Sequence, residues 1–187
     1  AAIYEAMATV SLHEGDQNAY RRAVVGQVKT LRDNLPADDV AVVAASTAYG
    51  DMWIKLRNYR QADMTYRGIE EQALAQGRAH PAIMAGMKRA WLAAAQGERR
   101  EAARMLDELE QRPIAQQSGY RIALRVLRLR LAVRDGDDVA ITRLAEAIGA
   151  EQSAVPILIW QPPYPASADA VDVGSAQALN GIAVRPG

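Results

Sequence analysis

The side chains that could bind a metal or act as a base are few and widely separated in this chain. His13 and His80 are its two histidines, and neither is accompanied by carboxylates at the spacing of a ligand set. His80 precedes Pro81 and is expected to contribute to a helix start. His13 stands at an expected helix end, where a partial positive charge is favourable. We therefore expect no metal site, no cofactor and no histidine base.

Two other short motifs resemble reactive sites without completing them. Asp135-Gly-Asp-Asp138 has the acids of a calcium loop but lacks the twelve-residue frame and the distal glutamate, so it favours a turn whose acids cap a helix. Asp172-Val-Gly-Ser175 lacks the second glycine of a nucleophile elbow. Cysteine is absent, which excludes thiolate chemistry and disulfides. The sequence predicts a protein that is not an enzyme.

Arg121, Arg125 and Arg128 form the one local basic stripe. Such a stripe could bind a carboxylate or a phosphate through paired hydrogen bonds. A solvated ridge, or pairing with acids of the next repeat, is the commoner role and the one that we favour. The sequence alone leaves these alternatives open.

The balance of charge restricts the class of partner. The chain has 22 basic and 22 acidic residues, so we expect no nucleic acid partner and no attraction to an anionic membrane. No stretch approaches the ~20 apolar residues of a membrane-spanning helix, so we expect no direct membrane insertion. The alanine-rich, lysine-poor composition favours a bacterium with a GC-rich genome. Cytoplasm and periplasm fit equally well.

Start and stop signals predict eight helices within residues 1–149. The expected bounds are Ala1 to His13; Asp16, as the cap, to Leu35; Asp38 or Asp39 to about Arg57; Tyr59 to Gln76; Pro81, at the first helical position, to Gly97; Gly97 to before Pro113; Ser118 to the turn at Asp135-Gly136-Asp137; and from this turn to Gly149. Pairing neighbours gives four helical hairpins, over residues 1–35, 38–77, 80–112 and 116–149.

The seventh expected helix has two apolar stripes. One comprises Tyr120, Leu124, Leu127 and Leu131, and the other Ile122, Val126, Leu129 and Val133. A helix with two apolar faces requires a packed neighbour on each of them, as in the interior of a helical solenoid.

A helical phrase recurs through the chain, with small or apolar residues in register at Val24, Ala62, Ala102 and Ala140. Its best copy has Gly50, Trp53, Tyr59, Ala62, Tyr66 and Ile69, and the next has Ala90, Gly97, Ala102, Leu106 and Leu109. These residues resemble the tetratricopeptide repeat, in particular the slightly long version of bacterial kinesin-light-chain-like proteins. The resemblance covers about residues 16–149. It departs from the family at Arg99, where an aromatic residue is usual, and at Arg128, where a small one is usual.

The resemblance implies an all-α fold, a right-handed α-solenoid of about four antiparallel hairpins over residues 1–150. It also implies a concave groove that binds a peptide of a protein partner. Carried over by register, the groove positions are Thr47, Asp51, Ile54, Lys55, Met84, Met87, Trp91, Ile122, Arg125, Leu129 and Val133. Methionine and tryptophan would give this surface an adaptable apolar character. Packing against a neighbouring helix, or against the chain's own tail, is the alternative role of these residues.

Residues 151–187 have a different composition, with prolines that favour an extended tail or linker. The apolar run from Ile157 to Trp160 is expected to dock, either elsewhere or in the groove itself. The phrase Gln161-Pro-Pro-Tyr-Pro165 is similar to the entry of a TonB-type C-terminal region in envelope proteins. The alternative function is therefore a structural spacer, or an autoinhibited repeat domain of a larger envelope protein. Exposed end hairpins could also stack to form a homodimer.

Overall fold

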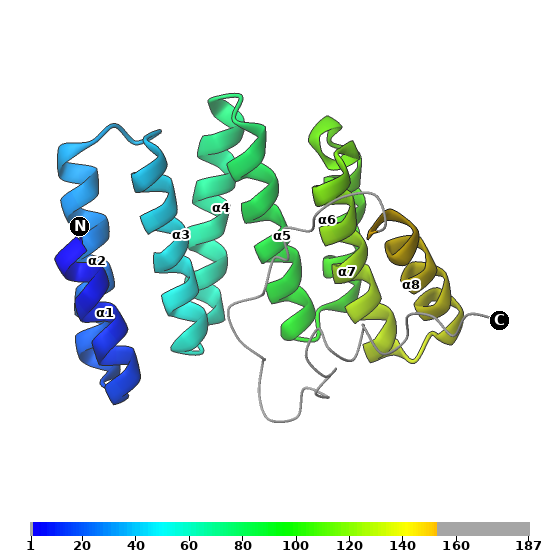
Figure 1. The fold of residues 1–187 in the computed structure, drawn as a ribbon, viewed down its shortest axis with the longest axis horizontal. Coiled ribbons are helices and arrows are strands. Elements are labelled where there is room, and N and C mark those ends of the chain that lie inside the picture. Colours follow the sequence, from blue (N-terminus) through cyan, green and yellow to red (C-terminus); the bar gives the residue numbers. More distant parts are fainter. Residues whose placement is uncertain (1, 153–187) are drawn as a thin grey trace.

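The computed structural model describes residues 2–152, and every regular element in this part of the chain is helical (Figure 1). The elements are α1 (Ala2–Glu14), α2 (Gln17–Asn34), α3 (Val40–Lys55), α4 (Tyr59–Ala75), α5 (Ala79–Ala95), α6 (Arg99–Glu110), the 3-10 helix η1 (Pro113–Gln116), α7 (Ser118–Asp135) and α8 (Asp138–Gln152). The helices stand side by side in one row, each packed against its neighbours in sequence. The all-α prediction is confirmed.

Three helix starts, those of α2, α3 and α8, are set by side chains that the sequence indicated. The Oδ1 atom of Asp16 accepts a hydrogen bond from the amide of Ala19 at 2.9 Å, and Asp137 does the same for Ala140 at 2.9 Å. Asp39 caps α3 by accepting from the amide of Ala41 at 2.8 Å. These bonds satisfy amides that have no partner within a helix. Of the acids predicted to cap α8, Asp137 does so, and Gly136 ends α7 with a φ of 69°.

Two predicted helix bounds were wrong. α5 begins at Ala79, so Pro81 is the third helical residue and not the first. Proline costs the helix no hydrogen bond at this position, because the amides of the first helical turn have no acceptor within the helix. α8 continues through Gly149 to Gln152. One glycine costs a helix only about 1 kcal/mol, and the last turn is held because Glu151 forms an ion pair with Arg121 at 2.7 Å.

Glycines allow the two helices of a hairpin to approach closely. A Cβ atom on Gly50 would lie 2.5 Å from the ring of Tyr66, which is fully buried on α4. A Cβ atom on Gly86 would lie 2.5 Å from Leu109 on α6. The role predicted for Gly50 is confirmed, and Gly86 serves the next hairpin in the same way.

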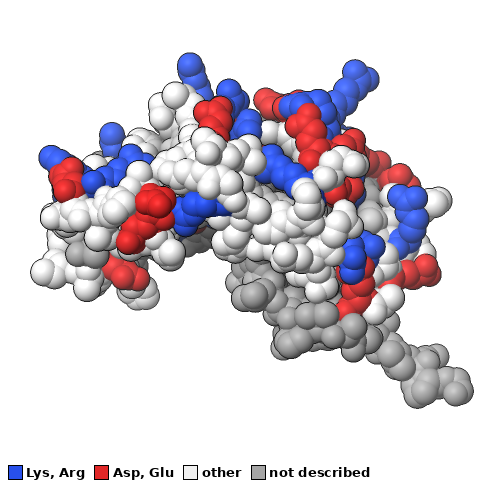
Figure 2. Space-filling view, turned by 90° about the horizontal axis from the view of Figure 1, so that it is seen from above, with Lys and Arg blue, Asp and Glu red and all other residues white. Residues whose placement is uncertain are grey.

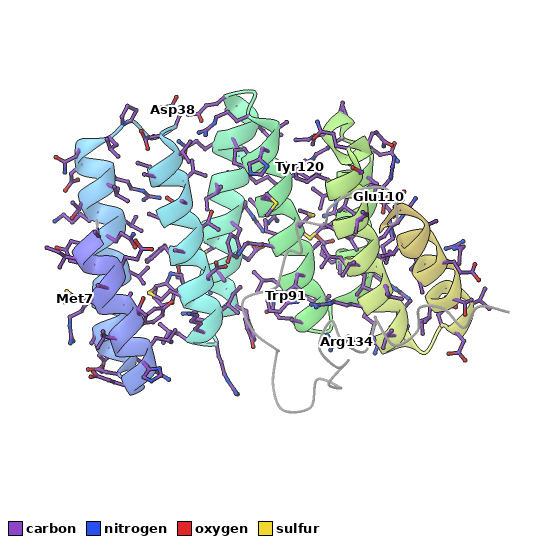
Figure 3. The ribbon with its side chains drawn as sticks, viewed as in Figure 1. Met7, Asp38, Trp91, Glu110, Tyr120 and Arg134 are labelled. Carbon is purple, nitrogen blue, oxygen red and sulfur yellow. The ribbon has the colours of Figure 1, made fainter. Side chains whose placement is uncertain are left out.

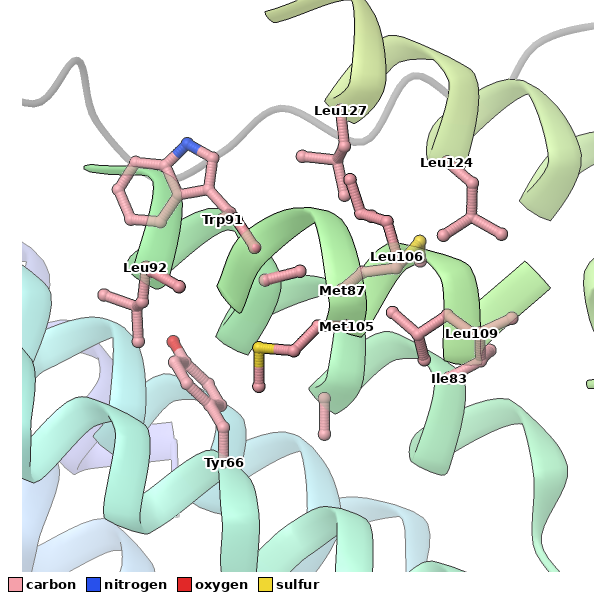
Figure 4. Close-up of a cluster of buried hydrophobic side chains, with 14 of the residues drawn as sticks. Tyr66, Ile83, Met87, Trp91, Leu92, Met105, Leu106, Leu109, Leu124 and Leu127 are labelled. Atoms are coloured by element: carbon pink, nitrogen blue, oxygen red, sulfur yellow. The ribbon is translucent and has the colours of Figure 1, made fainter. Parts of the chain in front are cut away.

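One apolar core extends across hairpin boundaries (Figure 4). Tyr66 from α4, Met87 from α5, Leu106 from α6 and Leu124 from α7 are all at most 1% exposed. A second cluster of Tyr20, Val24 and Met52 joins the first hairpin to the second. Because side chains of successive hairpins share these clusters, no hairpin buries its apolar face alone.

α7 packs on both of its predicted stripes, although unequally. Leu124, Leu127 and Leu131 of the first stripe are buried, whereas in the second stripe Ile122 is buried and Leu129 is half-buried. The predictions for the proline-containing tail, for the docking of residues 157–160 and for the TonB-like phrase lie outside the described residues.

The close contact between Gly50 and Tyr66 predicts the effect of a single methyl group. Gly50→Ala should lower the free energy of unfolding by about 2 kcal/mol, because the buried ring has no room to move. Gly68→Ala is the matched control, since a Cβ atom on this helical glycine meets nothing within 4 Å, and it should stabilise the protein by about 0.5 kcal/mol. Urea denaturation measures both. Equal effects of the two substitutions would contradict the close approach.

Candidate binding surface

The structure places the predicted groove residues on α3, α5 and α7, but several of them lie inside the protein. Ile54, Met87, Trp91 and Ile122 are 5%, 1%, 7% and 4% exposed. They pack against neighbouring helices, which was the alternative that the sequence left open. A partner could reach these side chains only if the helices moved apart.

The polar members of the predicted groove make contacts within the chain. Asp51 accepts hydrogen bonds from the hydroxyl of Tyr66 on α4 and from the Nζ atom of Lys88 on α5. Thr47 donates to the carbonyl of Val43 at 2.9 Å. Arg125 forms an ion pair with Glu151 and donates to the carbonyl of Ala147 at 3.1 Å. Asp51 and Arg125 therefore join helices to one another, whereas the bond of Thr47 lies within α3.

Lys55 takes part in a pair of contacts that join α2 to α3. Its Nζ atom lies 4.8 Å from the ring centre of Tyr20, and Arg21 lies 5.2 Å from that of Trp53. Each helix thus supplies one cation and one aromatic ring to the other, an arrangement in which the ring face attracts the positive charge. Tyr49 adds an edge-on contact to Trp53 at 5.6 Å between ring centres.

The half-buried apolar residues of the predicted set are Met84 on α5 and Leu129 and Val133 on α7. Thr47 on α3 is also half-buried. These four positions are the members of the predicted groove on α3, α5 and α7 that are half-buried and carry no charge. They form the candidate binding surface.

Between α4 and the hairpin that follows it, a buried carboxylate is held by two arginines. Glu70 is 6% exposed. Its Oε2 atom lies 2.8 Å from Nη1 of Arg89, and its Oε1 atom accepts from Arg112. Arg89 also contacts Asp63, at 2.9 Å. Asp63 forms a second ion pair with Arg67 at 2.9 Å, so each carboxylate of the cluster is paired, as a buried charge requires.

Gly86 helps to make room for this cluster, since a Cβ atom there would lie 3.0 Å from Glu70 Oε1. Burial by itself would lower the pKa of Arg89, but hydrogen bonds to Glu70 and Asp63 outweigh it and raise the pKa. The guanidinium of Arg89 thus stays charged between α4 and α5.

The basic stripe on α7 is paired with acids. The Nε atom of Arg128 lies 2.6 Å from Glu110 on α6, and Arg128 also contacts Asp107. Arg121 and Arg125 both contact Glu151 on α8. Pairing with acids, the role that we favoured, is confirmed, although the acids belong to the preceding hairpin and to the same hairpin. A cavity of about 460 Å³ beside this stripe is lined by these paired charges and also by Arg143, which forms no ion pair with a carboxylate among the described residues.

Opposite charges are also interspersed over the face shown in Figure 2. Figure 3 places Asp38 and Tyr120 toward one end of the helices, and Trp91 and Arg134 toward the other. His80 is exposed near the first of these ends, where its Nδ1 atom shares a hydrogen bond with the hydroxyl of Tyr120. Within residues 2–152, no three side chains of the metal-binding types lie close enough together to hold an ion.

The polar clusters around Lys88 and Glu70 were missed in the sequence. The available signal was a charged residue within an apolar helical stretch, as at Lys88 among Gly86, Met87, Ala90 and Trp91. Such a residue requires a partner, but the sequence does not identify it. None of the described helices is long and apolar enough to cross a bilayer.

Comparison of the chain with known protein families, with curated proteins and with solved structures found no match.

Because Glu70 is buried between two arginines, removing its charge without changing its shape should lower the stability of the protein strongly. Glu70→Gln should destabilise the protein by about 3 kcal/mol, because Arg89 and Arg112 lose the charge that balances them. Glu71→Gln, at the next and exposed position, should change stability by less than about 0.5 kcal/mol. Thermal or urea unfolding of the pair measures the difference. Similar losses in both variants would show that the buried ion pairs contribute little.

The buried phenol of Tyr66 should make the free energy of unfolding depend on pH in the alkaline range. Burial raises its pKa, and the carboxylate of Asp51 raises it further, so the folded protein keeps this phenol protonated. The unfolded chain ionises it above about pH 10. The unfolded state then binds fewer protons, so stability falls as pH rises, by up to about 1.4 kcal/mol per pH unit.

Tyr66→Phe should remove this contribution. The free energy of unfolding of the variant, measured by urea titration at a series of pH values, should fall less steeply above about pH 10 than that of the parent. Parallel curves would show that the phenol of Tyr66 ionises equally easily in both states.

Proposed function

We propose that this chain is a non-catalytic interaction module, a right-handed solenoid of the tetratricopeptide type that binds an extended peptide of a partner protein along α3, α5 and α7. The observation that carries the proposal is the consecutive packing of helical hairpins, which repeats a similar helix at regular intervals along one row. A row of equivalent helices offers a peptide a series of similar contact positions. The candidate binding surface of Thr47, Met84, Leu129 and Val133 supplies them.

The chemistry of this surface favours an apolar segment over a charged one. The charged members of the predicted groove, Asp51, Lys55 and Arg125, are engaged within the chain. Met84 can adapt its shape to different side chains because it is unbranched and polarisable. The partner peptide should therefore insert apolar side chains beside Met84 and Leu129.

A second function, that of a structural spacer, is favoured by a different observation. Ile54, Met87, Trp91 and Ile122 are buried in the array, and ion pairs join successive hairpins at Asp51–Lys88 and at Glu70–Arg89. Both features stiffen the row of helices. A spacer requires this stiffness and needs no open groove.

Selection of random displayed peptides on the intact chain tests the proposal. Enriched peptides should carry apolar residues, and a labelled copy should bind with a measurable anisotropy change. Met84→Gln should weaken binding about tenfold, because it places a polar amide against the apolar side chain of the bound peptide. The control is Met64→Gln on α4, where the methionine is exposed on a second helix of a hairpin, and binding should not change.

One result would contradict the peptide-binding function, and another would contradict the proposed site. The first is a selection that enriches no peptide, which would favour the spacer. The second is an enriched peptide that binds both variants equally, which would place its site away from Met84. Circular dichroism of each variant confirms that it remains folded.

A further inference from the structure

A cavity of about 320 Å³ lies where α2 ends and α5 begins, and none of its lining residues belongs to the candidate binding surface. Its walls come from α2, from the turn between α2 and α3, and from α3, α4 and α5. The apolar part of the lining includes Val42, Ile69 and Pro81, of which Val42 is 3% exposed. The cavity therefore spans two successive hairpins and has an apolar floor.

Two arginines, Arg32 and Arg78, line the same cavity. Arg32 donates through Nη2 to the hydroxyl of Ser46 at 3.1 Å, and Arg78 donates through Nη1 to the carbonyl of Asp38. Both acceptors are neutral. Neither arginine forms an ion pair with a carboxylate among the described residues. Arg89 differs, because it pairs with Asp63 and Glu70 and so joins α5 to α4.

The acids nearest in sequence do not neutralise this pair. Asp33, Asp38 and Asp39 flank the turn, but no ion pair joins any of them to Arg32 or Arg78, and Asp39 is used to cap α3. The remaining polar side chains of the lining are Ser46 and two glutamines, and no acidic side chain is among the described residues that line it. The cavity thus combines an apolar floor with two arginines that have no ion-pair partner among the described residues, of which Arg32 is exposed and Arg78 is half-buried.

We propose that this cavity binds a small free carboxylic acid with a short or branched alkyl chain. The carboxylate would be held by the guanidinium groups of Arg32 and Arg78, whose planar donors match its two oxygens. The alkyl chain would lie against Val42, Ile69 and Pro81, from which it displaces water. A carboxylate on an alkyl body fits both parts of the lining, whereas a bare phosphate would leave the apolar part uncovered.

The volume favours a small molecule. Ligand sites commonly enclose about 300–1,000 Å³, and this cavity stands at the low end of that range. The walls bring together the ends of helices from two hairpins, so a bound acid would join them. This binding site does not depend on the proposed peptide-binding function, because it shares no residue with the candidate binding surface.

Titration of the methyl-labelled chain with isovalerate tests the proposal by NMR spectroscopy. The methyl signals of Val42 and Ile69 should shift in a saturable manner. The neutral isovaleramide, which has nearly the same shape, should bind at least about tenfold more weakly, because it cannot form charge-assisted hydrogen bonds. Equal binding of acid and amide, or no shift at these methyl groups, would overturn the proposal.

Variants identify the residues that hold the acid. Arg32→Gln and Arg78→Gln should each weaken isovalerate binding about tenfold. Arg60→Gln, an exposed position on α4 outside the cavity lining, should leave binding unchanged. If all three variants bind isovalerate as the parent does, the site lies elsewhere and the proposal fails.

Binding of N-acetyl-leucine distinguishes a small free acid from the C-terminus of a peptide. This compound has a carboxylate and a branched alkyl group, as isovalerate does, and also the acylated nitrogen of a peptide C-terminus. It should bind more weakly than isovalerate, because the acetylated nitrogen adds bulk to a cavity of this size. Tighter binding of N-acetyl-leucine would overturn the assignment to a small free acid.

Discussion

The constraint on which this structure depends is that its helices have more apolar surface than one neighbour can cover. α5 buries ten of its 17 residues, and they contact helices on both sides of it. α1 has a single buried residue, Ser11, and leaves Ile3, Met7 and Val10 exposed. Contacts between hairpins therefore add to the stability that each hairpin gains from its own two helices, and the centre of the row gains more from them than the N-terminal end.

The same constraint explains where the charges lie. Helices that pack on two sides carry some of their polar residues into the boundaries between hairpins, where a charge must be paired. Lys88 meets Asp51 and Tyr66, and Glu70 meets Arg89, at successive places along the row. Arg32 and Arg78 stand beside a boundary without such acids, and the guanidinium groups of both donate hydrogen bonds to neutral oxygens.

Much of the fold could be predicted because its signals are local. Asp16 and Asp39 cap the helices that they precede, and Gly50 lies where two helices meet. The end of α8 could not be predicted, because Glu151 holds the helix beyond Gly149 through contacts with Arg121 and Arg125 on another helix. The candidate site was harder to predict for the same physical reason. The register places Met87 and Trp91 on one helix face, but only the packed structure shows that this face is covered.

Native-state hydrogen exchange tests most directly whether contacts between hairpins hold this fold together. The account predicts the slowest amide exchange in α4 and α5, which are covered on both sides, and the fastest in α1, which has one packed face. Opening should therefore begin at α1 and require less free energy than unfolding of the central hairpins. If α1 exchanged as slowly as α5, stability would not depend on neighbouring hairpins, and the account would be contradicted.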